Sequence, residues 1–176
     1  MNYKSLLYEI NNAPIADTST VNVPSNKQLY AVDLDSRTIS GPETISVQGE
    51  HYAETVYFLV DRFYDNMDLA QTNCVVQYAT DAGSFVYAVP FCDISTYDGK
   101  IIIPWSISLS ATQVAGTIRY FIRFYLIDDA SVLDASTGAY NPEGAEFAYS
   151  LSTRPASSRV MPSLSQEDFV AEDENL

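Results

Sequence analysis

The chain has 176 residues and a formal net charge of −14, because nine lysines and arginines are outnumbered by 23 aspartates and glutamates. Hydrophobic residues make up 47% of the sequence and aromatic residues 12%, enough for a packed core, which excludes an intrinsically disordered chain. The sequence has no basic stripe that could displace counterions from phosphates, so nucleic acid and anionic membranes are not expected as partners. It also has no run of 18 apolar residues, so no membrane-spanning helix is predicted.

Residues 1–28 are expected to form an arm that precedes the folded domain. Tyr3, Leu6, Leu7 and Ile10 follow the i, i+3, i+4, i+7 spacing of a short amphipathic helix. A helix of that length is marginal by itself and needs a partner surface. The apolar run is too short for a secretory signal, so synthesis in a cytoplasm is expected. The rest of the arm is polar and interrupted by proline, which indicates an extended segment.

Residues 29–155 are predicted to form one all-β domain. Short runs of β-branched and aromatic residues recur at near-regular spacing, and turn signals such as Asp81-Ala82-Gly83, a candidate hairpin, separate them. This pattern predicts an antiparallel β-sandwich of jelly-roll or immunoglobulin-like type. The expected strands are Leu29–Leu34, Glu43–Val47, Thr55–Asp61, Asn73–Ala79, Phe85–Phe91, Lys100–Pro104, Thr117–Ile127 and Glu146–Thr153.

The run Thr117–Ile127 is the strongest strand prediction in the chain. Its even positions from Ile118 to Leu126 are all apolar or aromatic, which predicts a core face. On the opposite face Arg119 and Arg123 alternate with aromatic rings, and each guanidinium needs a carboxylate, a carbonyl or a ring as partner. Asp61 is expected to pair either with its neighbour Arg62 or with one of these two arginines, so Arg119 and Arg123 are candidates for ion pairs within the domain or at an interface.

Two further segments are polar. Asp128–Gly144 is rich in Asp, Ser, Gly and Pro and is long for a connection, and connections of that length are usually functional or mobile. Residues 156–176 are predicted to be an acidic tail, with five acids and no base from Met161 onward. Phe169 and Val170 are its expected anchors on a neighbouring surface.

Few residues offer catalytic or ligand chemistry. His51 is the only histidine, and beside Glu50 it is either a general base or a structural histidine, but no nucleophile motif accompanies it. Asp65, Asn66 and Asp68 could offer oxygens to calcium, or they form a turn, since the glycine and distal glutamate of an EF-hand loop are missing. No cofactor, metal site or enzymatic activity is therefore predicted.

Three residues leave alternatives open. Cys74 and Cys92 lie in apolar strands without a metal-ligand spacing, so they are either buried thiols or one disulfide. Trp105 follows the apolar run Ile101–Ile103. It is either a core or interface anchor or a platform on which a sugar stacks.

Several segments together resemble the N-terminal domain of tailed-phage baseplate upper proteins and related β-sandwich domains of phage tail and fibre proteins. The resemblance covers residues 43–160. The segments are ISVQGEHYAETVYFLVDRFYDNMD at Ile45–Asp68, CVVQY at Cys74–Tyr78, VPFCDI at Val89–Ile94, IIIPWSI at Ile101–Ile107, GTIRYFIRFY at Gly116–Tyr125 and YSLSTRPASSRV at Tyr149–Val160.

The resemblance implies a non-enzymatic virion protein, assembled in the host cytoplasm, whose partners are copies of itself and other virion structural proteins. Because an acidic tail stands where those proteins continue into a fibrous part, an adaptor or joint in the tail or baseplate is expected. The alternatives are a capsid decoration or head-fibre base protein, and a carbohydrate-binding module for host surface glycans. The resemblance also implies that Arg119 and Arg123 are fixed partners of acids such as Asp61 or Asp65, because the arginine–aromatic pattern is part of the domain's signature. The expected interface residues are Tyr3, Leu6, Leu7, Ile10, Trp105, Arg119, Arg123, Phe169 and Val170.

Overall fold

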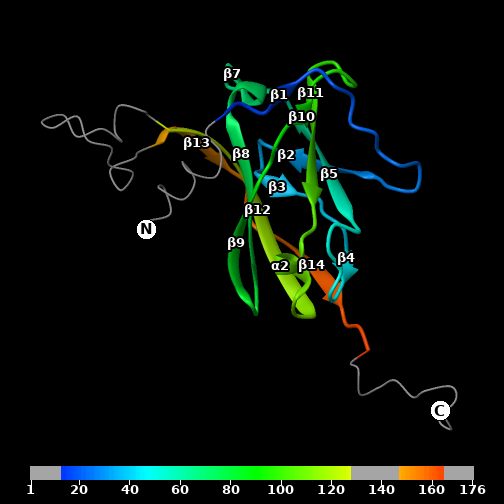
Figure 1. The fold of residues 1–176 in the computed structure, drawn as a ribbon. Helices are drawn as coiled ribbons and strands as arrows, with labels where there is room; N and C mark the ends of the chain where they lie inside the picture. Colours follow the sequence, from blue (N-terminus) through cyan, green and yellow to red (C-terminus); the bar gives the residue numbers. More distant parts are fainter. Residues whose placement is uncertain (1–12, 128–146, 165–176) are drawn as a thin grey trace, which may run out of the picture.

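The computed structural model describes residues 13–127 and 147–164, and their regular secondary structure is almost entirely β-strand (Figure 1). Helical structure in these ranges is limited to the 3-10 turn η1 (Leu69–Gln71) and the short helix α2 (Leu109–Thr112). The predicted all-β class is confirmed. The strands are β1 (Ala16–Asp17), β2 (Leu29–Asp33), β3 (Thr38–Ile39), β4 (Thr44–Val47), β5 (Thr55–Asp61), β6 (Phe63–Tyr64), β7 (Met67–Asp68), β8 (Asn73–Thr80), β9 (Gly83–Ala88), β10 (Cys92–Asp93), β11 (Lys100–Ser106), β12 (Gly116–Ile127), β13 (Phe147–Ser152) and β14 (Ala156–Met161).

The first of two large sheets, named sheet 1 here, has the strand order β1-β10-β11-β5-β2-β3. Its centre is the antiparallel pair β5 and β11, in which Lys100 lies opposite Asp61 and Ser106 lies opposite Thr55. Along β5 every second side chain is buried, beginning with Val56, and the residues between them are partly exposed. This period of two directs one apolar face of the sheet toward the core.

The second large sheet, sheet 2, has the order β4-β14-β12-β8-β9, and β13 joins it as a further partner of β12. β12 spans 12 residues and pairs with β8 on one edge and with β14 and then β13 on the other. Where β13 ends, the amide of Ile122 donates to Thr153 Oγ1 at 3.0 Å and the amide of Thr153 donates to the Ile122 carbonyl at 3.0 Å. Thr153 thereby continues the hydrogen bonding of β12 just before Pro155, which has no amide hydrogen.

One hydrophobic core lies between the two sheets, and aromatic side chains cross it. The ring of Trp105 in β11 lies 5.1 Å from that of Tyr120 in β12 and 5.6 Å from that of Tyr78 in β8, between ring centroids. Phe58 of β5 lies 6.3 Å from Tyr120. Trp105 is only 1% exposed, so it joins the sheets from within, and its assignment as an interface residue is wrong.

Gly41 marks a point where the main chain passes directly over the core. A Cβ atom at this position would lie 1.9 Å from Tyr120 Oη, so only glycine fits beside this hydroxyl. Ser158 Oγ donates to the carbonyl of Pro42, and Tyr120 Oη lies 2.8 Å from Ser158 Oγ. Because the one hydroxyl hydrogen of Ser158 is used by Pro42, Tyr120 is the donor in the second bond.

Two tight hairpins follow from local sequence. Asp81 and Ala82 join β8 to β9, and Gly83 has a φ of 142°, so the predicted hairpin is confirmed. Asp65 and Asn66 join β6 to β7 with φ values of 47° and 67°. Two central residues with positive φ are typical of a type I′ turn, for which Asn and Asp are favoured after glycine.

The strand directions differ from the prediction of a purely antiparallel architecture. β1 with β10, β2 with β5, and β4 with β14 are parallel pairs. Both sheets are therefore mixed. The reason is that each parallel partner arrives through a long connection, which can return the chain in either direction, whereas the predicted hairpins require antiparallel strands.

The predicted domain limits at residues 29 and 155 are also too narrow. Ile15, from the predicted arm, is 1% exposed in the core, and β1 follows it. At the other end, Ser158 and Val160 of β14 are buried although they lie in the predicted tail. β14 pairs with β12 because the backbone groups along that edge of β12 need partners.

Candidate functional site

Charged residues are divided unevenly between the strands of the two sheets. The strands of sheet 1 carry four aspartates and one lysine: Asp17, Asp33, Asp61, Asp93 and Lys100. The six strands of sheet 2 carry no acidic residue and three arginines: Arg119, Arg123 and Arg159. In a chain with a net charge of −14, sheet 2 is thus a locally positive surface.

The outer face of sheet 2 contains an apolar hollow of about 430 Å³. Phe121 and Arg119 of β12 line it together with Val86 of β9 and Ala79 of β8; the full lining is Gln77, Tyr78, Ala79, Ser84, Phe85, Val86, Arg119, Tyr120, Phe121 and Pro155. Beside it lies a small second hydrophobic cluster, in which Val75 and Tyr125 are fully buried although they face away from the main core. The outer face therefore combines apolar side chains with guanidinium groups.

Arg123 is held in place on this face by polar and aromatic contacts. Its Nε donates to Gln77 Oε1 at 3.0 Å and its Nη1 donates to Ser150 Oγ at 3.0 Å. The guanidinium carbon lies 5.7 Å from the ring centroid of Phe121 and 5.4 Å from that of Phe147. Such positions over ring faces are favourable for a cation, so Arg123 is a structural link across three strands.

Arg119 is exposed, and no side-chain hydrogen bond or ion pair joins it to another residue within 13–127 or 147–164. The predicted pairing of Arg119 and Arg123 with Asp61 is wrong, because Asp61 forms an ion pair with Lys100, its register partner on β11. The ion pairs between described residues do not include Asp65 either. Asp61 belongs to sheet 1, whereas both arginines belong to sheet 2, and sequence spacing cannot reveal that separation.

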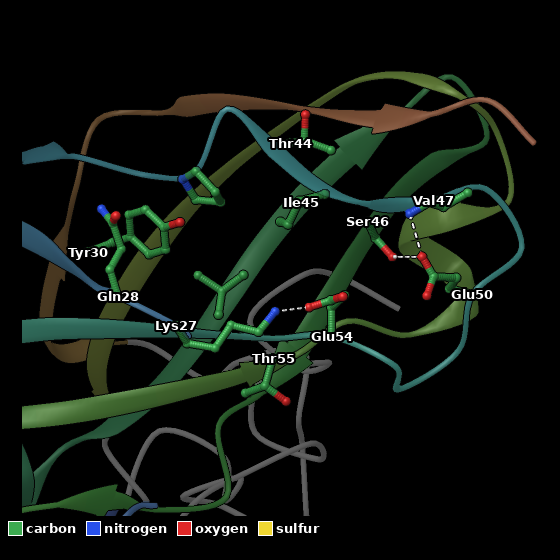
Figure 2. A pocket seen from close by; sticks show the side chains of 12 residues that line it. Lys27, Gln28, Tyr30, Thr44, Ile45, Ser46, Val47, Glu50, Glu54 and Thr55 are labelled. Atoms are coloured by element: carbon green, nitrogen blue, oxygen red, sulfur yellow. Dashed lines mark hydrogen bonds and ion pairs between the residues drawn. The ribbon is translucent and has the colours of Figure 1, made fainter. Parts of the chain in front are cut away.

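A second hollow, of about 220 Å³, lies where β4 of sheet 2 faces β2 and β5 of sheet 1 (Figure 2). Lys27 and Glu54, which precede β2 and β5, form an ion pair on the sheet 1 side of it. Glu50 Oε1 accepts the amide of Val47 at 2.8 Å and the hydroxyl of Ser46 at 3.4 Å. Lys27, Glu50 and Glu54 therefore connect neighbouring segments of the chain, and we assign this hollow a structural role.

The arrangement around His51 does not resemble a catalytic pair. The exposed imidazole accepts the amide hydrogen of Leu109 at Nδ1, with a distance of 2.9 Å, and its ring lies 3.9 Å from that of Tyr52. Glu50 bonds the Ser46–Val47 turn instead of the imidazole. His51 therefore serves as an acceptor in front of α2.

The candidate calcium residues are used in the β6–β7 hairpin. Both oxygens of Asp68 accept hydrogen bonds from Arg62, each at 3.0 Å, and one also accepts the amide of Ala70 at 3.0 Å. The hydrogen bond from Arg62 lowers the pKa of Asp68, against the effect of burial. Asp65 and Asn66 occupy the turn itself. Within residues 13–127 and 147–164 no group of three His, Cys, Asp or Glu side chains could hold a metal ion.

The strongest polar cluster is one that sequence patterns did not identify. Asp93, 1% exposed, accepts the amides of Val21, Ser95 and Thr96 and the hydroxyls of Ser95 and Thr96, at 2.6–3.1 Å. Burial favours a raised pKa for Asp93, but these hydrogen bonds outweigh it and lower the pKa to about 2. The Asp-x-Ser-Thr sequence signals the local turn; the bond from Val21, which fastens the N-terminal segment, has no such signal.

Cys74 and Cys92 are free thiols buried in the core. Burial raises the pKa of the Cys74 thiol well above its usual value and that of Cys92 to about 12. Of the two interpretations of these cysteines, the buried thiols are correct. Neither residue has the lowered pKa of a reactive cysteine.

A comparison with protein families finds no family model that matches the chain. A search of curated proteins likewise finds no match. Within the described residues, no helix is long and apolar enough to cross a membrane. Several predicted features lie outside the described residues: the Asp128–Gly144 connection and the anchors Tyr3, Leu6, Leu7, Ile10, Phe169 and Val170.

Proposed function

We propose that this chain is a non-enzymatic structural protein of a tailed-phage virion, a β-sandwich that joins tail or baseplate-fibre components as repeated copies. The observation that carries the proposal is the outer face of sheet 2, which combines an apolar hollow with three arginines and no acid on its strands. The resemblance of residues 43–160 to baseplate upper proteins and related tail domains supports the same function.

The composition of this face suits a protein interface. Arginine and aromatic residues are enriched in interface centres, where a buried ring and a bidentate donor contribute most of the binding energy. Phe121 and Arg119 supply both at the hollow. The rest of the chain is strongly acidic and therefore repels other acidic surfaces. This repulsion favours docking through the outer face of sheet 2 and disfavours docking elsewhere.

A structural function is also supported by how the reactive side chains are used. His51, Asp68 and Asp93 accept hydrogen bonds that close turns or fasten segments, and Cys74 and Cys92 are buried with raised thiol pKa values. None of these groups faces the hollow on sheet 2. The described residues thus offer binding surface without a nucleophile and base beside it.

A capsid decoration or head-fibre base protein is the alternative within the same class, because such a protein also docks on neighbours through one face. The carbohydrate-binding alternative depended on Trp105, together with exposed tyrosines, as a stacking platform. Since Trp105 is 1% exposed, it cannot stack on a sugar, and this alternative has lost its main residue and retains only exposed tyrosines such as Tyr52 and Tyr97.

Purified particles test the proposal. We expect an antibody against the folded domain to label tailed particles at one repeated position, and that position separates the tail from the head. Phe121→Asp should abolish incorporation while leaving the circular dichroism spectrum unchanged, because a buried charge prevents docking. Tyr57→Asp, at a partly exposed aromatic on the outer face of sheet 1, is the matched control. Absence of the chain from particles overturns the virion function; equal incorporation of both variants overturns the assigned face.

A further inference from the structure

The chain contains a segment whose charge and apolar residues match the outer face of sheet 2. Residues 165–176 have the sequence SQEDFVAEDENL, with five acids, no base and the apolar pair Phe169 and Val170 in the middle. The face has the opposite character, since its strands carry arginines, no acids and an apolar hollow. An acidic segment with an aromatic anchor is thus complementary to it in both charge and polarity.

Two arginines on the outer face of sheet 2, one of them at the hollow, are available for such a segment. Arg119 lines the hollow, and Arg159 lies opposite Thr117, two residues along the same face of β12. Both residues are exposed, and no side-chain ion pair joins either one to another described residue. The amide of Arg159 donates to the carbonyl of Glu43, but their side chains form no ion pair between described atoms.

We propose that the acidic segment 165–176 of a neighbouring copy of this chain binds the outer face of sheet 2. Phe169 and Val170 enter the hollow beside Phe121, and the carboxylates on either side of them pair with Arg119 and Arg159. The inference rests on the proposed assembly function and identifies a second copy of the chain as the partner on this face.

The reach of the segment favours a neighbouring copy over the same chain. From Ser157, opposite Arg119, β14 runs toward the end of the sheet where β4 lies (Figure 1). There the amide of Ser163 donates to Gln48 Oε1 at 3.5 Å. Six residues of extended chain separate Ser157 from Ser163, which is roughly 20 Å. The six residues from Ser163 to Phe169 span at most about 21 Å. A segment that must first reverse direction and then cross β12 falls short of the hollow in its own chain.

The contacts would be both apolar and electrostatic. Burial of Phe169 removes an aromatic side chain from water, which is the larger favourable contribution. The exposed arginine pairs add less, and their contribution falls as salt screens them. Association through this contact should therefore weaken with added salt but not disappear.

Disulfide trapping in the full-length chain tests the contact. One variant carries Ala79→Cys at the hollow and a second carries Val170→Cys, and the two are mixed under mild oxidation. The native Cys74 and Cys92 are buried with raised thiol pKa values and do not compete. Ala31→Cys, on an exposed strand position of sheet 1, replaces Ala79→Cys in the control mixture. We expect about tenfold more mixed disulfide with Ala79→Cys than with Ala31→Cys, because docking raises the effective concentration of the thiol.

The other results are equally informative. Adding Arg119→Glu to the Ala79→Cys chain should lower the trapping about tenfold, because the pairing charge is reversed. Three results would each overturn the inference. The first is an Ala79→Cys/Val170→Cys double variant that forms its disulfide only within one chain, and the second is equal trapping with Ala31→Cys. The third is trapping of Leu6→Cys in place of Val170→Cys, which would assign the face to the N-terminal arm. Particle labelling is independent of this test. Incorporation without trapping refutes only the contact, and trapping without incorporation refutes only the virion function.

Discussion

Gly41→Ala tests whether the close passage of the main chain over Tyr120 is required. The added methyl group would overlap Tyr120 Oη, at 1.9 Å, and would touch Cζ at 3.1 Å. Tyr120 cannot simply turn away, since its ring is 1% exposed and packs against Trp105 and Phe58. The Gly41 segment and the ring must therefore separate, and the bond from Tyr120 to Ser158 is lost.

The magnitude follows from three contributions. Overpacking a core by one methyl group costs about 1–3 kcal/mol, and a lost buried hydrogen bond costs about 1 kcal/mol more. Replacing glycine by alanine restricts the unfolded chain, which returns about 0.4–1 kcal/mol. The free energy of unfolding should fall by about 2 kcal/mol, which corresponds to a decrease in Tm of roughly 4–8 °C for a chain of this size.

Urea denaturation followed by the fluorescence of Trp105 measures this loss. In a Tyr120→Phe background the clashing oxygen and its hydrogen bond are both absent, so Gly41→Ala should cost about 2–4 kcal/mol less there, a coupling that a double-mutant cycle reports directly. Gly49→Ala is the matched control, because Gly49 has a φ of +88° and nothing within 4 Å of the added Cβ. Its cost of about 1 kcal/mol arises from backbone strain and should be the same in both backgrounds.

Equal destabilisation by Gly41→Ala with and without the Tyr120 hydroxyl would refute the reasoning. A more stable Gly41→Ala variant would refute it as well, because the contact would then be absent in solution.

Three further predictions follow from buried residues. Asp93 has a pKa lowered to about 2, so its contribution of about 2 kcal/mol to the free energy of unfolding is present above pH 4 and is lost as the pH falls toward 2. Asp93→Asn should remove this contribution at pH 7. A difference in urea midpoint between variant and parent that stays constant from pH 2 to 5 would contradict this. Trp105→Ala should cost about 3–5 kcal/mol, and an unchanged urea midpoint, followed by circular dichroism, would contradict its core position. Cys74 and Cys92 should react with a thiol reagent only after unfolding, since burial raises both thiol pKa values; rapid labelling of the native protein would contradict their burial.

The sequence alone determined those parts of the fold that depend on neighbours in the chain. The period of two in Thr55–Asp61 and in Thr117–Ile127 predicted β5 and β12 to within one residue. The hairpin at Asp81–Gly83 was predicted for the same reason, because glycine supplies the positive φ that its turn requires. In each case the deciding interactions are steric and lie within a few residues.

Contacts between distant residues were decided only by the tertiary structure. Ile15 enters the core because Thr72 accepts its amide hydrogen, and β14 is ordered because β12 offers it a free edge. The partner of Asp61 is Lys100 rather than an arginine, since the register of β5 and β11 places the two side by side. Such pairings cannot be predicted from local composition.

The surface of sheet 2 combines both levels. Composition alone determined that the chain is strongly acidic, with a net charge of −14. That Arg119, Arg123 and Arg159 share one face without an acid was decided by the pairing of β14 with β12, which joins residues about 40 positions apart in the chain. An electrostatic surface depends on which strands become neighbours, and only the folded sheet determines that.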